Sequence, residues 1–235
     1  MQLATLKALN DDRRARRAAI LLTDLTDGSD RVVREGEALD GELGAAIARA
    51  FRTGLSASVA AGGRNWFLNA HLPAPRLVVI GAVHISQALA PMALLAGFDM
   101  QIIDPRTGFA TRERFPHVPV HAQWPEDVLS RTPFDAWTAV AALTHDPKID
   151  DLPLQQALAA GCFYVGALGS RKTHAKRVER LLGIGVEQSA IDRIRAPIGL
   201  DIGASTPAEI AVAVLAQVVG ALRTRNLGPP QGDGS

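Results

Sequence analysis

The stretch from Gly166 to Lys172 has the composition of an anion-binding turn. It reads G-A-L-G-S-R-K and lies between a predicted strand and a predicted helix. Free N–H groups at a helix start, together with lysine and arginine side chains, bind phosphate and carboxylate groups. Gly169, Ser170, Arg171 and Lys172 are therefore candidate ligand-binding residues, although a plain turn with a solvated basic face explains the pattern equally well. The phosphate-binding-loop pattern G-x-x-x-x-G-K-[ST] is not matched.

A second candidate turn follows the apolar run that ends at Ile80. It contains Gly81 and His84, and Asp104 follows at close to the ~20-residue spacing at which an acid contacts the ribose of a dinucleotide. Val83 occupies the position at which a second glycine lets the backbone approach a pyrophosphate, so we expect it to hinder dinucleotide binding. For His84, a ligand contact and a helix-capping role are both open.

His145 and Asp146 form the third candidate, as an acid/base pair or as joint metal ligands. Adjacent residues seldom point the same way in extended chain, and aspartate before Pro147 suits a turn. Hydrogen bonding within a turn is the favoured interpretation, and a ligand contact is the alternative. The patterns G-x-S-x-G, H-E-x-x-H and C-x-x-C are absent, so we assign no catalytic residue and no metal site.

These turns form one site if the strands before them are parallel neighbours. Residues 77–80 and 100–103 are apolar runs separated by helical spacing, which is the β-α-β unit that opens a doubly wound nucleotide-binding sheet. Further strands are predicted at 118–122, 136–143 and 162–165, and further helices at 125–131, 149–160, from 171, 187–193 and 206–223. Because ligands bind beyond the carboxyl ends of parallel strands, the sequence predicts an α/β, Rossmann-like fold with one ligand site at that edge.

The first 72 residues have a different pattern, which predicts a small α+β unit. Helical segments are expected at 1–17 and 39–51, and hairpins at 18–34 and 56–70. Pro73-Ala74-Pro75 is a stiff linker candidate. We therefore divide the chain into residues 1–72, a Rossmann-like domain at 76–225, and a tail at 226–235 whose glycine and proline content predicts disorder.

The composition is that of a soluble globular protein, with 235 residues, 47% of them hydrophobic and 21% charged. A formal net charge of +1 gives no argument for nucleic acid. The single cysteine, Cys162, excludes an intramolecular disulfide, and we expect it to be an inert core residue. The longest apolar run, 210–222, is shorter than the ~20 residues that span a membrane, and no apolar signal core is seen, so we expect a cytoplasmic protein.

Several segments, in order, resemble the XdhC/CoxI family, the accessory proteins of xanthine dehydrogenase and carbon monoxide dehydrogenase. They cover about residues 75–223 and are R-L-V-V-I-G-A from Arg76, I-D-P-R to Arg106, L-T-H-D-P-K to Lys148, F-Y-V-G-A-L-G-S-R-K-T to Thr173, P-I-G-L-D-I-G-A from Pro197 and T-P-A-E-I-A from Thr206. The chain departs from many members at two places. Val83 stands at a glycine position, and residues 1–70 lack a cysteine.

The resemblance implies a Rossmann C-terminal domain that binds molybdenum cofactor, supports its sulfuration and delivers it to a xanthine dehydrogenase or related molybdenum hydroxylase. That client is the implied partner, and a cysteine desulfurase and a second copy of the chain are further candidates. The expected cofactor-binding residues are Gly81, His84, Asp104, Arg106, His145, Asp146, Gly169, Ser170, Arg171 and Lys172. The alternative is an NAD(P)-dependent oxidoreductase, which the position of Asp104 favours.

Overall fold

The computed structural model describes residues 2–224, which divide into a first unit of residues 2–73 with 223–224 and a second unit of residues 74–222. The two units meet in sequence between Pro73 and Ala74. This division falls within the predicted linker. Each unit has its own sheet. The predicted tail at 226–235 lies outside the described residues.

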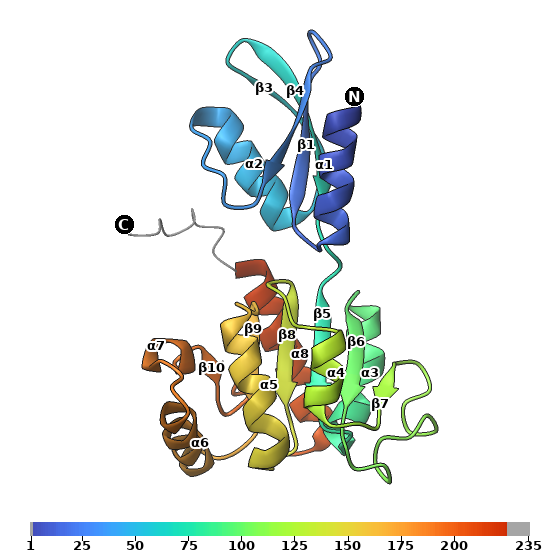
Figure 1. The fold of residues 1–235 in the computed structure, drawn as a ribbon, viewed down its shortest axis with the longest axis vertical. Helices are drawn as coiled ribbons and strands as arrows, with labels where there is room; N and C mark the ends of the chain where they lie inside the picture. The colour runs from blue at the N-terminus through green and yellow to red at the C-terminus, as the bar shows by residue number, and fades with distance from the viewer. Residues whose placement is uncertain (1, 225–235) are drawn as a thin grey trace. The chain divides into compact units, whose positions relative to one another are not determined.

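The first unit is an antiparallel sheet with two helices (Figure 1). Its strands, in the order β2-β1-β4-β3, are β1 (Ala19–Asp24), β2 (Asp30–Arg34), β3 (Ala57–Ala61) and β4 (Arg64–His71), and its helices are α1 (Leu3–Arg14) and α2 (Gly41–Thr53). Both predicted hairpins are confirmed, since β1 pairs with β2 and β3 pairs with β4. Buried Asp12 of α1 accepts hydrogen bonds from Arg17 and from Arg34 of β2, which joins the helix to the sheet.

The second unit is built on a six-stranded parallel sheet in the order β10-β9-β8-β5-β6-β7. The strands are β5 (Arg76–Ile80), β6 (Asp99–Ile103), β7 (Val120–His121), β8 (Thr138–Ala142), β9 (Tyr164–Ala167) and β10 (Ile194–Arg195). The chain runs outward from β5 in one direction and then returns to continue on its other side. This order, with its reversal between β5 and β8, confirms the predicted doubly wound fold.

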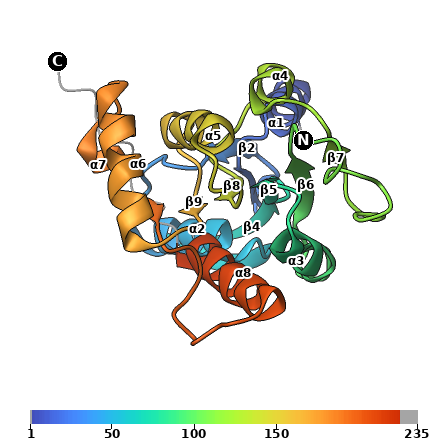
Figure 2. The same ribbon diagram turned by 90° about the horizontal axis from the view of Figure 1, so that it is seen from below.

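Helices cover both faces of this sheet (Figure 2). They are α3 (His84–Leu95) and α8 (Pro207–Thr224) on one face and α4 (Pro125–Arg131) and α5 (Pro147–Ala159) on the other, with α6 (Arg171–Gly183) and α7 (Gln188–Ile191) beside α5. Leu77 and Val79 of β5 pack in the core with α3 and α8, whereas Val78 and Ile80 pack in the core with α4 and α5. Burial on both faces explains why β5 is a continuous apolar run.

Several predicted boundaries were wrong for local reasons. The strand expected at 118–122 is only Val120–His121, because Pro119 has no N–H to donate and β7 lies at the sheet edge. The strand expected from 136 starts at Thr138, because the Asp135 carboxylate holds a turn by accepting hydrogen bonds from the N–H of Trp137 and the hydroxyl of Thr138. The two-residue strand β10 was not predicted, since it is too short to show a period.

The strand expected at 162–165 is shifted, and β9 runs from Tyr164 to Ala167. Gly166 therefore lies in the strand instead of the following turn. A Cβ atom at this position would lie 2.6 Å from the hydroxyl oxygen of Tyr164 and 2.7 Å from the side chain of Ile198, so packing requires glycine here. Helix α5 begins at Pro147, two residues before the predicted start, because proline suits the first helical position.

Among residues 2–224, α8 is the helix that is long and apolar enough to cross a membrane by length and composition alone. Ala211, Val214 and Val218 on this helix are buried in the core of the second unit. Packing against the parallel sheet therefore accounts for one apolar side of α8.

Candidate functional site

The register of the sheet brings the predicted turns together at its carboxyl edge. The last residues of four adjacent strands stand side by side, namely Ile103, Ile80, Ala142 and Ala167. Figure 2 looks onto this edge of the sheet, where the segments that leave β5, β6, β8 and β9 converge. All candidate residues lie on these segments, so the parallel sheet gathers them as expected.

Gly81 is required by the neighbouring turn. Its φ of 117° lies where side chains are rarely tolerated. A Cβ atom would lie 2.8 Å from the Cγ2 atom of Thr144 and 3.3 Å from the Thr144 backbone nitrogen. The absence of a side chain at Gly81 thus lets the loop after β8 pass close to the loop after β5.

The Asp104 carboxylate is buried and already fully engaged by protein donors. One oxygen accepts hydrogen bonds from the backbone N–H and Nε of Arg106, both at 2.9 Å. The other accepts from Arg106 Nη2 and from the Ala82 N–H, both at 2.7 Å. Burial acts to raise the pKa of Asp104, but these hydrogen bonds outweigh it and hold the pKa below its usual range. Asp104 and Arg106 therefore stiffen the turn, and a ribose hydroxyl would have to share oxygens that are in use.

The start of α3 does not use His84 as a cap. Val83 is the N-cap residue, no side chain accepts a capping hydrogen bond there, and α3 begins at His84, whose side chain is exposed. The Val83 side chain packs against the core of the second unit. His84 is left as a candidate for a ligand contact on the rim.

Asp146 has the turn role that was favoured for it. Its side chain accepts a hydrogen bond from the Lys148 N–H at 3.0 Å and caps α5. His145 precedes it with a φ of 65°, a left-handed conformation that is uncommon for residues other than glycine. Its N–H donates to Asp150 at 3.0 Å. This conformation places the His145 ring near Gly169, since Nδ1 would lie 3.6 Å from a Cβ atom there.

The turn before α6 combines a glycine with a helix cap. Gly169 has a φ of 134°, and a Cβ atom there would lie 3.1 Å from the Cγ2 atom of Thr173. The Ser170 hydroxyl caps α6 by accepting a hydrogen bond from the Thr173 N–H at 3.2 Å. Lys172 lines the pocket described next, whereas Arg171 is exposed and is not among its lining residues.

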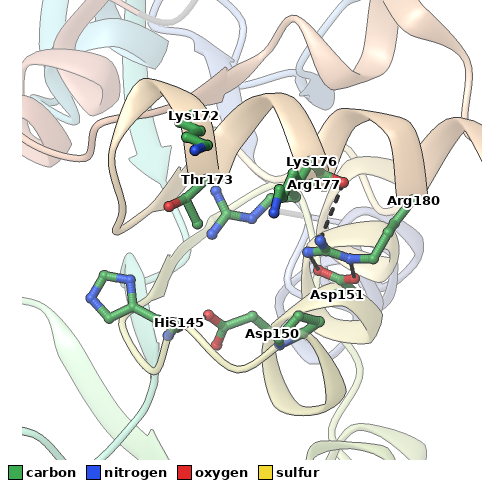
Figure 3. A pocket seen from close by; sticks show the side chains of 9 residues that line it. His145, Asp150, Asp151, Lys172, Thr173, Lys176, Arg177 and Arg180 are labelled. Atoms are coloured by element: carbon green, nitrogen blue, oxygen red, sulfur yellow. Dashed lines mark hydrogen bonds and ion pairs between the residues drawn. The ribbon is translucent and has the colours of Figure 1, made fainter.

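A pocket of about 230 Å³ lies between the first turn of α5 and the side of α6 that runs from Lys172 to Arg180 (Figure 3). Its lining residues are His145, Pro147, Asp150, Asp151, Lys172, Thr173, Lys176, Arg177 and Arg180. The sequence predicted only His145 and Lys172 among them as site residues. The others could have been found from helical spacing, because side chains three and four positions apart share one face of a helix.

The charged residues of this pocket are unevenly paired. Arg180 forms a two-point ion pair with Asp151, at 2.6 and 3.0 Å. Asp150 is buried and accepts hydrogen bonds from the hydroxyl of Thr144 at 2.7 Å and from the His145 N–H. Burial raises the pKa of Asp150 to about 6, despite these hydrogen bonds and the nearby positive charge of Arg177. Partial desolvation, with a contribution from the charge of Arg177, lowers the pKa of His145, which favours a neutral imidazole at pH 7.

The raised pKa of Asp150 gives a testable dependence of stability on pH. Because the folded protein holds this proton more tightly than the unfolded chain, the contribution is fully present below the unfolded value of 3.8 and is lost as the pH rises through about 6. In the unmodified protein, this effect should lower the free energy of unfolding by roughly 1–3 kcal/mol between pH 4 and 7. We expect the decrease to be absent in Asp150→Asn. Urea unfolding of both proteins across this range measures their free energies of unfolding. Carboxylates such as Asp104 have the opposite pH trend in both proteins, so their contribution cancels when one free energy is subtracted from the other. A constant difference would contradict the assignment.

Residues 77–218 match the family model described as the XdhC Rossmann domain. The chain belongs to the XdhC family. The matched range contains the four turns and every residue that lines the pocket, so the site lies within the family's own domain.

Curated relatives agree with membership in the XdhC family. A protein named as a probable subunit of xanthine dehydrogenase, from Bacillus subtilis, is 32% identical over 66% of this chain and 45% of its own length. The molybdenum cofactor insertion chaperone PaoD from Escherichia coli is 32% identical over 66% of this chain and 42% of its own length. The uncharacterized protein YqeB from Escherichia coli is 34% identical over 72% of this chain and 30% of its own length. The chain thus spans less than half the length of each.

A solved structure shares the fold. The crystal structure of a protein named xanthine dehydrogenase from Bacillus halodurans superposes with a TM-score of 0.66 at 24% identity. The match covers 94% of this chain and 67% of that one. The fold shared with that structure therefore extends beyond residues 77–218.

Proposed function

We propose that this XdhC family protein is a cytoplasmic accessory protein that binds molybdenum cofactor and supports its sulfuration and its insertion into a xanthine dehydrogenase or related molybdenum hydroxylase. One relative is named as a molybdenum cofactor insertion chaperone and another as a probable subunit of xanthine dehydrogenase, which supports this role at the level of the family. A cysteine desulfurase and a second copy of the chain are further proposed partners.

The observation that carries the proposal is the convergence of four turns on one edge of the sheet. Gly81 lets the backbone after β8 pass close by, Gly169 leaves room for the side chains of Thr173 and His145, and the α6 start with Lys172 contributes positive charge. A phosphate-bearing pterin suits such an edge, since hydrogen-bond donors and cations are available there. The candidate residues do not include a nucleophile paired with a base, which favours a binding role over a catalytic one. Molybdenum cofactor is the cargo in this proposal and not a resident group.

The one cysteine gives no support to sulfur transfer by this chain itself. Cys162 is buried, and burial raises the pKa of its thiol to about 12, so the thiolate that could carry sulfur is disfavoured. In the proposed role, sulfur comes from a partner enzyme while this chain holds the cofactor.

The alternative of an NAD(P)-dependent oxidoreductase has less support. The doubly wound sheet suits a dinucleotide, but Val83 stands in the phosphate turn and both oxygens of Asp104 already accept hydrogen bonds. Titrating the purified chain with molybdenum cofactor, NAD(H) and NADP(H) separates the two functions. Micromolar affinity for a dinucleotide without affinity for the pterin would overturn the proposal.

Two neighbouring cations provide a matched test of where the cofactor binds. Lys172 lines the pocket and Arg171 does not, although both are exposed residues at the start of α6. We expect Lys172→Ala to weaken cofactor binding roughly 10-fold through loss of one charge-assisted hydrogen bond, and Arg171→Ala to weaken it about 3-fold or less. Calorimetric titration of both variants makes the comparison. Equal affinity of the double variant and the unmodified protein would remove this edge as the binding site.

A further inference from the structure

Arg177 is a buried cation whose hydrogen bonds are incomplete. It lies in the middle of α6, and only 2% of its surface is exposed. Its Nη2 donates to the Leu168 carbonyl oxygen at 3.0 Å, while Nε and Nη1 have no hydrogen-bond partner among the described residues. Figure 3 shows its guanidinium extending from α6 into the pocket. A buried guanidinium with two idle donors costs free energy, which a matching anion would recover.

The carboxylates of the pocket do not accept hydrogen bonds from the two idle donors of Arg177. Asp150 uses its two oxygens on Thr144 and on the His145 N–H. Asp151 is taken by Arg180. Burial lowers the pKa of Arg177, and the charges of Asp150 and Asp151 offset this only in part. The guanidinium is therefore short of negative charge on its pocket side.

The other side chains around Arg177 suit a small oxyanion. Thr173 lies one helical turn before it on the same face of α6 and places a hydroxyl at the pocket, and Lys172 and Lys176 add two amino groups. The N-terminus of α6 adds the positive end of the helix dipole. A cavity of about 230 Å³ is smaller than the ~300–1,000 Å³ typical of pockets that enclose an organic ligand, so it suits one charged group of a larger molecule.

We infer that this pocket binds a dianionic phosphate group and that Arg177 is the residue that recognises it. Arginine suits phosphate because it keeps its positive charge and offers several N–H donors in one plane. Nε and Nη1 are the two idle donors here, and because their N–H bonds point to different edges of the guanidinium, each offers a separate charge-assisted hydrogen bond. The inference that a phosphate group binds here depends only on the geometry of the pocket. The inference that this group is the terminal phosphate of the pterin rests on the proposed function.

The first test uses inorganic phosphate and the full chain at constant ionic strength. We expect phosphate to bind the unmodified protein and to raise its unfolding temperature. Arg177→Met should weaken phosphate binding about 10- to 100-fold, the loss expected for two charged hydrogen bonds, while Arg52→Ala, at an exposed cation of α2 in the first unit, should leave it within about 2-fold. Arg177→Met removes an uncompensated buried charge, so the variant should fold and be at least as stable. Arg177→Lys, which keeps the charge but lacks the planar set of N–H donors, should also bind phosphate weakly, and it serves if Arg177→Met fails to fold.

The second test compares the phosphorylated pterin with its dephosphorylated form. We expect the phosphorylated form to bind at least 10-fold more tightly to the unmodified protein, with the advantage lost in Arg177→Met. Phosphate binding without pterin binding would overturn the proposed function and leave the pocket assignment standing. Pterin binding that is indifferent to its phosphate and to Arg177 would overturn the identification of the pterin phosphate as the ligand of this pocket. Failure of the unmodified protein to bind inorganic phosphate at millimolar concentration would overturn the pocket assignment itself.

Discussion

Gly81→Ala is expected to lower the free energy of unfolding by about 3 kcal/mol, through backbone strain at its φ and a clash with the neighbouring loop. A φ of 117° lies beyond the left-handed helical region that alanine can enter. The added methyl carbon would stand 2.8 Å from the Cγ2 atom of Thr144, so one of the two loops must move. Urea unfolding with a two-state fit measures the change.

Gly97→Ala is the matched control for the backbone contribution. Gly97 has a φ of 83° and ends the α3 region, and a Cβ atom there would meet nothing within 4 Å. We expect this variant to lose only about 1–2 kcal/mol, the cost of a left-handed alanine. Thr144→Ser removes the clashing methyl group and should restore part of the stability of Gly81→Ala. Equal losses at Gly81 and Gly97, with no rescue by serine, would show that the contact with Thr144 is unimportant.

The sequence predicted the parallel core of the second unit because its strands are buried on both faces. Residues 77–80 could be recognised as a strand from their composition alone, and the burial of each of them explains why. Short edge strands carry no such signal. β7 and β10 have two residues each, and their positions follow from pairing with β6 and β9 instead of from their own composition.

The turns of the site were also predictable, but their hydrogen bonds were not. The loops after β5, β6, β8 and β9 fall at the carboxyl edge in any parallel sheet, so their convergence follows from the topology. Whether Asp104 faces a ligand or its own chain depends on the path of the next two residues. In the structure, the carboxylate oxygens of Asp104 accept hydrogen bonds from Arg106 and from the Ala82 N–H.

Arg177 was missed for a related reason. In the sequence it is one of several cations in a basic helix, where the usual interpretation is a solvated face. Its burial depends on the packing of α6 beside α5, which places Asp150 and Asp151 opposite it. A buried cation cannot be distinguished from an exposed one by residue type, and only the helical spacing of Thr173 and Arg177 hints at a shared face.

His145→Ala is expected to weaken binding of molybdenum cofactor by about 1–3 kcal/mol, because the neutral imidazole can donate one hydrogen bond and accept another. The His145 backbone N–H, which donates to Asp150, is kept in this variant. His145→Asn is the matched control, since asparagine tolerates a φ of 65° better than alanine and keeps a polar side chain. We expect asparagine to retain more of the affinity. Calorimetry gives the affinities, and reconstitution of a molybdenum hydroxylase client gives the functional effect.

The relation between these two measurements decides what His145 does. In a carrier, client activation should fall only as far as occupancy falls, and raising the cofactor concentration should restore it. In a catalyst, loss of an acid or base at this position should reduce the rate ~100-fold or more at full occupancy. The carrier outcome is expected, since the described pocket holds no cysteine or serine that His145 could activate. Normal cofactor affinity combined with abolished activation would contradict it and make His145 a participant in the chemistry.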